Sequence, residues 1–209
     1  MPLRSSLDRA RQWVGKGGFI FRRLAHVATS WLRNCTGGHV LVVLNFVLSY
    51  GAWLAVASLA ARGDFLWAVV PSLIAVAIHL ILVPPQRRRP DFLLCLAAIP
   101  LGVAVEGWNM ATGATRFAAG ADVAGGPPLF IIGLWMAFAT LPNVSLSWLK
   151  QRPTVAVLFG AIAAAPSYYA GAKIGALTMG EPVWQSLVLI GAAWAMALPA
   201  LLYLARRIG

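Results

Sequence analysis

The sequence has few charged residues. Only 11% of its 209 residues are charged, whereas soluble domains carry about 25%, and only six residues are acidic. Because 60% of the residues are hydrophobic, a water-facing globule built from this chain would expose large apolar patches. These shortages exclude an ordinary soluble domain and favour a membrane protein.

Reactive and metal-binding side chains are also scarce. Two cysteines, Cys35 and Cys95, are too few for a disulfide scaffold and have no zinc-type spacing. The chain has no His-Glu-x-x-His site, Gly-rich phosphate loop, Gly-x-Ser-x-Gly elbow or Cys-x-x-Cys pair. We therefore expect no catalytic residue, no metal site and no cofactor. A haem held by His39 and His79 is sterically conceivable near one end of the first two predicted helices, and no other cofactor site suggests itself.

Long apolar runs, in contrast, are abundant. Runs of about 17–25 apolar residues can cross roughly 30 Å of hydrocarbon as helices, and the runs lack the alternation of a barrel strand. The predicted fold class is therefore all-α: a polytopic membrane helical bundle in which residues 39–209 form a domain of about six transmembrane helices. The predicted spans are 39–61, 66–83, 92–110, 128–149, 154–178 and 183–205.

The basic residues between these runs predict an orientation. Fourteen of the seventeen lysines and arginines fall on one side of the predicted bundle, which carries both termini and the triplet 87–89. The other side has only Arg62 and Arg116. Cytoplasmic loops are enriched in Lys and Arg, so we expect a multi-pass protein with both termini in the cytoplasm. This placement also argues against a nucleic-acid partner, despite the net charge of +11.

Residues 1–38 are predicted to be a basic extension on the cytoplasmic side. Its apolar side chains are interspersed with arginines, which is typical of an interfacial amphipathic helix whose basic residues contact anionic lipid. A Gly17-Gly18 pair would interrupt that helix, and a basic tail without regular structure is the alternative.

Proline and small residues mark the predicted helices. Internal prolines predict kinks that leave space between helices, either for a ligand or for tight packing. They are Pro71, Pro100, Pro142, Pro166 and Pro199. Ser167, Gly171 and Gly175 recur every four residues, which predicts a smooth face for close helix packing.

Polar residues inside the predicted spans form two layers. Toward the outer side lie Glu106 and Asn109 in the third span, and Tyr169 and Lys173 in the fifth. Glu106 and Lys173 have opposite charges at similar depth, so we expect an ion pair, because lone ions inside a membrane are costly. That pair could form the polar floor of a cavity, or it could be a purely structural contact.

The second layer lies toward the cytoplasm. It contains Asn45 with Ser49, His79, and Asn143 with Ser147. Asparagines in such positions often donate hydrogen bonds between helices or to a carbonyl freed by proline. We expect interhelical hydrogen bonds here, and a hydrogen-bonded His79 rather than a metal ligand.

Two stretches, residues 133–149 and 160–176, resemble the signature helices of the DUF2878 family, small bacterial inner-membrane proteins of unassigned function. Asn45 and Glu106 fit the same resemblance, which covers about residues 40–205. It implies a bacterial inner membrane, draws attention to Glu106, Asn143, Tyr169 and Lys173, and favours a lipid-related role through gene neighbourhood. It supplies no reaction.

Two functions remain open from the sequence. The first is binding or transport of a lipid or hydrophobic small molecule in a cavity between kinked helices. The second is an accessory or assembly subunit that docks a larger membrane protein complex, which predicts a solid bundle. An enzymatic function would need chemistry from Glu106, Tyr169 and Lys173, and no motif supports it.

Overall fold

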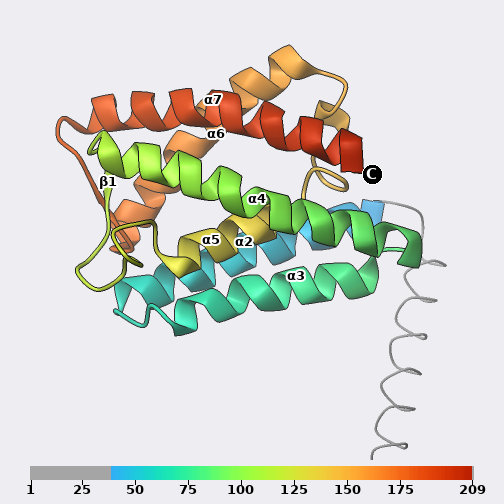
Figure 1. Ribbon diagram of the computed structural model, residues 1–209, viewed down its shortest axis with the longest axis horizontal. Helices are drawn as coiled ribbons and strands as arrows, with labels where there is room; N and C mark the ends of the chain where they lie inside the picture. Colours follow the sequence, from blue (N-terminus) through green and yellow to red (C-terminus); the bar gives the residue numbers. More distant parts are fainter. Residues whose placement is uncertain (1–38, 209) are drawn as a thin grey trace, which may run out of the picture. The chain divides into compact units, whose positions relative to one another are not determined.

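The computed structural model describes residues 39–208, and the described part from Val42 onward forms one compact unit. Its six α-helices are α2 His39–Ala61, α3 Val70–Leu82, α4 Pro85–Ala111, α5 Leu129–Phe138, α6 Pro153–Ile174 and α7 Val183–Ile208 (Figure 1). Two 3₁₀ turns, η1 Trp67–Val69 and η2 Ser147–Leu149, and two short strands, β1 Thr115–Arg116 and β2 Thr178–Met179, complete it. The all-α prediction is confirmed for this part, and the predicted N-terminal helix lies outside it.

Four of the six helices are long and apolar enough to cross a membrane. These are α2, α4, α6 and α7, whereas α5 and the segment Trp67–Leu82 are shorter apolar helices. Large apolar side chains on the long helices point outward: Ile162 of α6 and Met196 of α7 are 70% and 71% exposed. Such surfaces suit a lipid environment, and they support a membrane protein with four candidate spans rather than six full ones.

The predicted fourth span, 128–149, is wrong in its second half. Helix α5 ends at Phe138, four residues before Pro142. Proline has no N–H to donate to the carbonyl four residues earlier, and the Phe138 carbonyl instead accepts from the Leu141 N–H at 3.0 Å. Residues 139–152 continue as turns, and Pro142 lies in this segment rather than inside a helix.

Pro71 is also not internal, because it occupies the first turn of α3, where no helical partner is lost. Pro100, Pro166 and Pro199 do lie inside α4, α6 and α7, and α4 contains Pro90 as well. Three of the five predicted internal prolines are therefore confirmed as internal.

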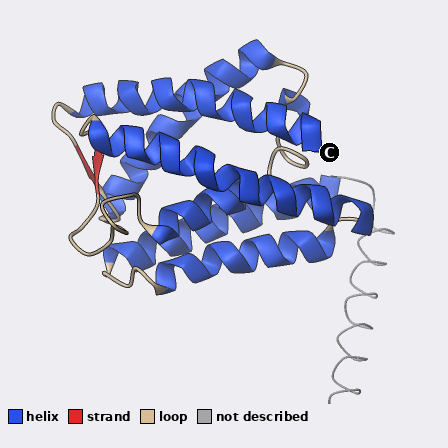
Figure 2. Cartoon of the chain, in the orientation of Figure 1, coloured by secondary structure: helices blue, strands red, loops and turns tan. Residues whose placement is uncertain are grey.

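Successive segments run in alternating directions, so the connections gather at two ends (Figures 1 and 2). One end, the basic end, contains the α3–α4 connection, the turn around Lys150 and the end of α7, where Arg206 donates to the Lys150 carbonyl at 3.4 Å. At the opposite end, β1 pairs with β2 in antiparallel register. The two sets of loops predicted from charge are therefore separated in space.

Helices α6 and α7 pack closely, with α6 running obliquely along α7 (Figure 1). A Cβ added at Gly160 would lie 2.3 Å from the Trp194 carbonyl oxygen, and one at Gly191 would lie 2.8 Å from the Ala161 carbonyl oxygen. These two glycines allow the backbones to approach, as small residues do in membrane helix pairs.

The residues predicted to form a small-residue face on α6 do not supply this close contact with α7. Ser167 and Gly171 line a cavity, and Gly175 is the left-handed C-cap of the helix, with φ 96°. That backbone conformation favours glycine, which explains Gly175 as a helix stop rather than as part of a packing stripe.

Candidate functional site

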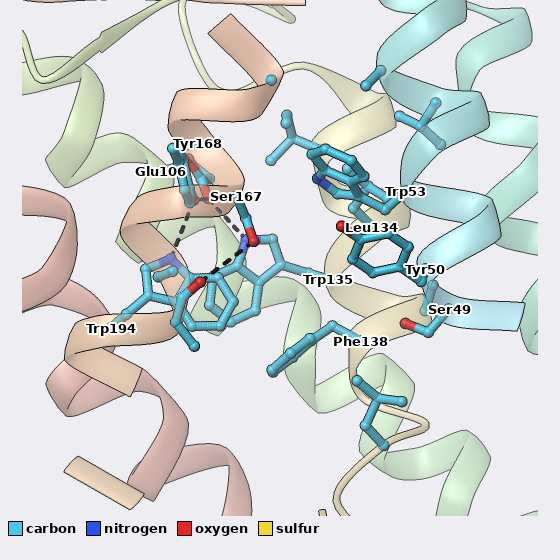
Figure 3. A pocket seen from close by; sticks show the side chains of 18 of the residues that line it. Ser49, Tyr50, Trp53, Glu106, Leu134, Trp135, Phe138, Ser167, Tyr168 and Trp194 are labelled. Carbon is cyan, nitrogen blue, oxygen red and sulfur yellow. Dashed lines mark hydrogen bonds between the residues drawn. The ribbon is translucent and has the colours of Figure 1, made fainter. Parts of the chain in front are cut away.

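A cavity of about 380 Å³ lies between α2, α5 and α6 (Figure 3). The cavity exists because α5 ends at Phe138, about halfway along the predicted span 128–149. The turns that follow supply Leu141 and Leu146 to its wall. Small residues of α6, including Gly160 and Ala164, leave the space open on another side. Its volume falls within the ~300–1,000 Å³ range of small-molecule sites.

The cavity is lined mainly by aromatic rings. The Trp135 and Trp194 rings stack with centroids 4.6 Å apart, and Phe138 packs edge-on against Trp194 at 5.1 Å. Tyr50 and Trp53 of α2 form a second aromatic group that lines the cavity (Figure 3). The aromatic lining residues are Phe46, Tyr50, Trp53, Phe117, Phe130, Trp135, Phe138, Phe159, Tyr168 and Trp194.

Glu106 supplies the only carboxyl group among the described residues that line this cavity. Helix α4 carries it, and the side chain is 1% exposed. Its Oε1 accepts from Trp135 Nε1 at 3.0 Å and from the Tyr168 hydroxyl, while Oε2 accepts from Asn109 Nδ2 at 3.4 Å. Trp194 Nε1 in turn donates to the Tyr168 oxygen at 3.2 Å. Side chains of α4, α5 and α6 therefore meet at one buried carboxyl, and α7 joins them through Tyr168.

Gly102 makes this geometry possible. It lies one helical turn before Glu106 on α4, and a Cβ there would be 2.5 Å from the Trp135 ring. The indole can therefore lie flat on α4 with its N–H directed at Glu106. Asn109 is completely buried, and its Oδ1 has no hydrogen-bond partner among the described residues.

The predicted ion pair between Glu106 and Lys173 is not formed in the described structure. Lys173 is exposed, and its Nζ lies 5.2 Å from the centroid of the Tyr169 ring, which is 43% exposed. The α6 residue that contacts Glu106 is Tyr168, the residue directly before Tyr169. Neighbouring helix residues differ in direction by about 100°, so Tyr169 and Lys173 share a different face of the helix.

Three residues of the second predicted layer, Asn45, His79 and Asn143, come together around Asp91, which was not among the predicted polar residues. Asp91 of α4 is 1% exposed, and its Oδ2 lies 3.0 Å from His79 Nε2. Its Oδ1 accepts from Asn143 Nδ2 at 2.6 Å. Arg87, one turn earlier on α4, is 4.0 Å from the carboxylate.

The orientation of Asn45 determines the state of His79. The Ser145 backbone N–H can only donate, and it faces Asn45 Oδ1 at 3.4 Å, as does the Ser145 hydroxyl at 2.7 Å. Asn45 Nδ2 therefore donates to His79 Nδ1 at 3.2 Å. His79 consequently carries its proton on Nε2 and donates it to Asp91.

Asn45 also holds the turns that follow α5. Its Nδ2 lies 3.0 Å from Thr140 Oγ1 and 3.4 Å from the Thr140 carbonyl. The Ser145 hydroxyl, which has one hydrogen to donate, lies between two acceptors, Asn45 Oδ1 and the Val42 carbonyl at 2.9 Å. Non-helical backbone at membrane depth requires such partners, so this network stabilises the broken segment. The expected interhelical hydrogen bonds of Asn45 and His79 are thus present.

Asn143 connects this network to the basic end. Lys150 Nζ donates to its Oδ1, and Arg87 Nη2 donates to its carbonyl. Partial burial lowers the pKa of the Lys150 amine, with repulsion from Arg87 and Arg206 adding to the effect and Asp91 opposing it. Ser49, in contrast, lines the cavity, and Ser147 donates locally to the Val144 carbonyl at 2.8 Å.

A haem held by His39 and His79 would have to replace a hydrogen bond of His79, because its two ring nitrogens contact Asn45 and Asp91. No group of three or more His, Cys, Asp or Glu side chains within residues 39–208 could hold a metal ion. Cys95 is a free, buried thiol, and Cys35 lies outside the described residues.

Comparison with known proteins places the chain in a family. No curated protein and no solved structure matches it. One family model, described as a protein of unknown function (DUF2878), matches residues 42–200. The match includes Asn45, Asp91, Glu106, Asn143 and Tyr168, and with them both the cavity carboxyl and the buried polar network. The chain therefore belongs to the DUF2878 family.

Proposed function

We propose that the chain is a multi-pass protein of a bacterial inner membrane that binds or moves a lipid or another hydrophobic small molecule in the cavity between α2, α5 and α6. The observation that carries this proposal is the cavity itself, which is apolar except for a few polar groups. Ser49, Tyr50, Ser167 and Tyr168 supply hydroxyl groups, and Glu106 supplies the carboxyl. A mostly apolar pocket with a few convergent polar groups is the usual form of a small-molecule site.

The rim of the cavity supports access from the bilayer. Phe46 and Tyr50 of α2 both line the cavity and are 53% and 58% exposed. Phe159 of α6 also lines it and is 38% exposed. With these side chains in hydrocarbon, an apolar ligand could pass sideways between α2 and α6 without crossing water.

The orientation with both termini in the cytoplasm is part of the proposal. It rests on the clustering of Arg87, Lys150 and Arg206 at the basic end. Contacts with anionic lipid there, and at the extension 1–38, remain predictions. An accessory-subunit role predicts a solid bundle, so the cavity favours ligand binding over that alternative.

Blocking the cavity should remove the bound ligand. Ser167→Phe adds a ring at an exposed residue that lines the cavity and should narrow it, whereas Ile162→Phe on the same helix changes a side chain that is 70% exposed and does not line it. We expect native mass spectrometry in mild detergent to detect a co-purified small molecule in the unmodified protein and in Ile162→Phe. Occupancy in Ser167→Phe should fall about tenfold, the equivalent of about 1.4 kcal/mol. Equal occupancy in all three proteins would refute ligand binding in this cavity.

A further inference from the structure

The described residues that line the cavity include an acidic side chain but no basic one. Among the described residues that line it, Glu106 is the only acid, and there is no Lys, Arg or His. A ligand with a phosphate or carboxylate group inside the cavity would meet a carboxyl and no counter-charge. The lining therefore disfavours anionic head groups in its interior.

Glu106 is held by neutral donors alone. Trp135, Tyr168 and Asn109 are its hydrogen-bond partners, and no described basic side chain forms an ion pair with it. The basic residue nearest along α6, Lys173, contacts the Tyr169 ring instead. A carboxyl buried without a cation is costly to ionise, so a cationic ligand beside Glu106 would supply the counter-charge that the described residues do not.

The aromatic rings around the cavity suit the same ligand. The facing sides of the Trp135 and Trp194 rings cover each other, with centroids 4.6 Å apart, whereas Tyr50 and Trp53 line the cavity from α2 with tilted rings whose centroids are 5.6 Å apart. Ring faces attract cations, most strongly where water is excluded, and aromatic cages bind quaternary ammonium groups in this way. Glu106 and these rings line the same cavity, so one ligand could use both attractions.

We infer that the ligand of this cavity is an amphiphilic cation, with an apolar body between the aromatic walls and an ammonium head directed at Glu106. The inference rests on the proposed function and specifies the class of ligand. Uncharged lipids with the same chain are expected to bind less tightly, and anionic lipids less tightly still.

Three probes with the same twelve-carbon chain separate these possibilities: dodecyltrimethylammonium, dodecanol and dodecanoate. The full chain is placed in nanodiscs of zwitterionic lipid, and binding is followed by tryptophan fluorescence, with empty nanodiscs correcting for partitioning. We expect the cation to bind at least about tenfold more tightly than the alcohol, and the carboxylate to bind most weakly.

Two variants test whether Glu106 causes the preference for the cation over the alcohol. Glu106→Gln should reduce cation affinity to about that of the alcohol and leave alcohol affinity within about threefold, whereas Asp64→Asn, an exposed loop acid, should change neither. If the alcohol binds as tightly as the cation, or if Glu106→Gln keeps the preference, the inference is wrong. The proposed function still stands in that case if Ser167→Phe abolishes binding of all probes, and it fails if Ser167→Phe has no effect.

Discussion

Replacing Asp91 with alanine is expected to lower the free energy of unfolding by about 2–4 kcal/mol, because two donors, on His79 and Asn143, each lose their acceptor. The change leaves the buried His79 Nε2–H and the Asn143 amide without their acceptor. It also leaves Arg87 without the carboxylate 4.0 Å away. Since Asn143 and Asn45 both hold the turns after α5, the loss should extend to that segment.

Unfolding in mixed micelles with increasing denaturing detergent would measure this effect. Asp64→Ala is the matched control, because Asp64 is exposed in a loop, and it should change stability by no more than about 0.5 kcal/mol. If both variants have the same stability, the buried network does not hold the segment 139–152.

Replacing Glu106 with leucine is expected to cost about 2–4 kcal/mol, because buried Trp135 and Tyr168 each lose their acceptor. Glu106→Gln should cost much less. Its amide oxygen can still accept from both donors, and its amide N–H can donate to the Asn109 Oδ1, which has no partner among the described residues. Thermal unfolding in detergent would compare the two variants, and equal losses would contradict the hydrogen-bond network around Glu106.

A double-mutant cycle distinguishes this network from the ion pair predicted from the sequence. The structure predicts that Glu106→Gln and Lys173→Met are additive within about 0.5 kcal/mol, because Lys173 contacts Tyr169 instead. Glu106→Gln and Tyr168→Phe should couple, since their hydroxyl and carboxyl are hydrogen-bonded. A strong coupling between Glu106 and Lys173 would contradict this result and support the ion pair.

The long helices were predictable because apolar length is a strong signal. The predicted spans 39–61 and 183–205 match α2 and α7 to within a few residues. The predicted span 128–149 was too long, because an apolar run does not show where its backbone stops being helical. Pro142 was the available signal, since a helix that loses the N–H at 142 can end at Phe138.

The sequence predicted how deep the polar residues lie in the bundle, but not the direction in which each side chain points from its helix. Asn45, His79 and Asn143 were correctly grouped, whereas Tyr168 was missed in favour of Tyr169 because helix rotation is not fixed by one sequence. Asp91 was missed because it follows three arginines and resembled a loop residue. Its spacing of four from Arg87 was a weak sign of an intrahelical pair. The contact of Trp135 with Glu106 could not be predicted, because in the sequence Trp135 is one of many residues in an apolar run.

Photoaffinity labelling tests the cavity most directly. A long-chain amine carrying a diazirine at the end of its chain would be bound to the full chain in nanodiscs and activated by light, and the labelled residues would be mapped by peptide mass spectrometry. A ligand in the cavity should label the buried wall of α5 and the following turns, including Phe138 and Leu141, and excess unlabelled amine should suppress that labelling. The same labelling is repeated with the uncharged alcohol of equal chain length, and labelling by both probes confined to outward residues such as Ile162 and Met196, with none on α5, would contradict ligand binding in the cavity.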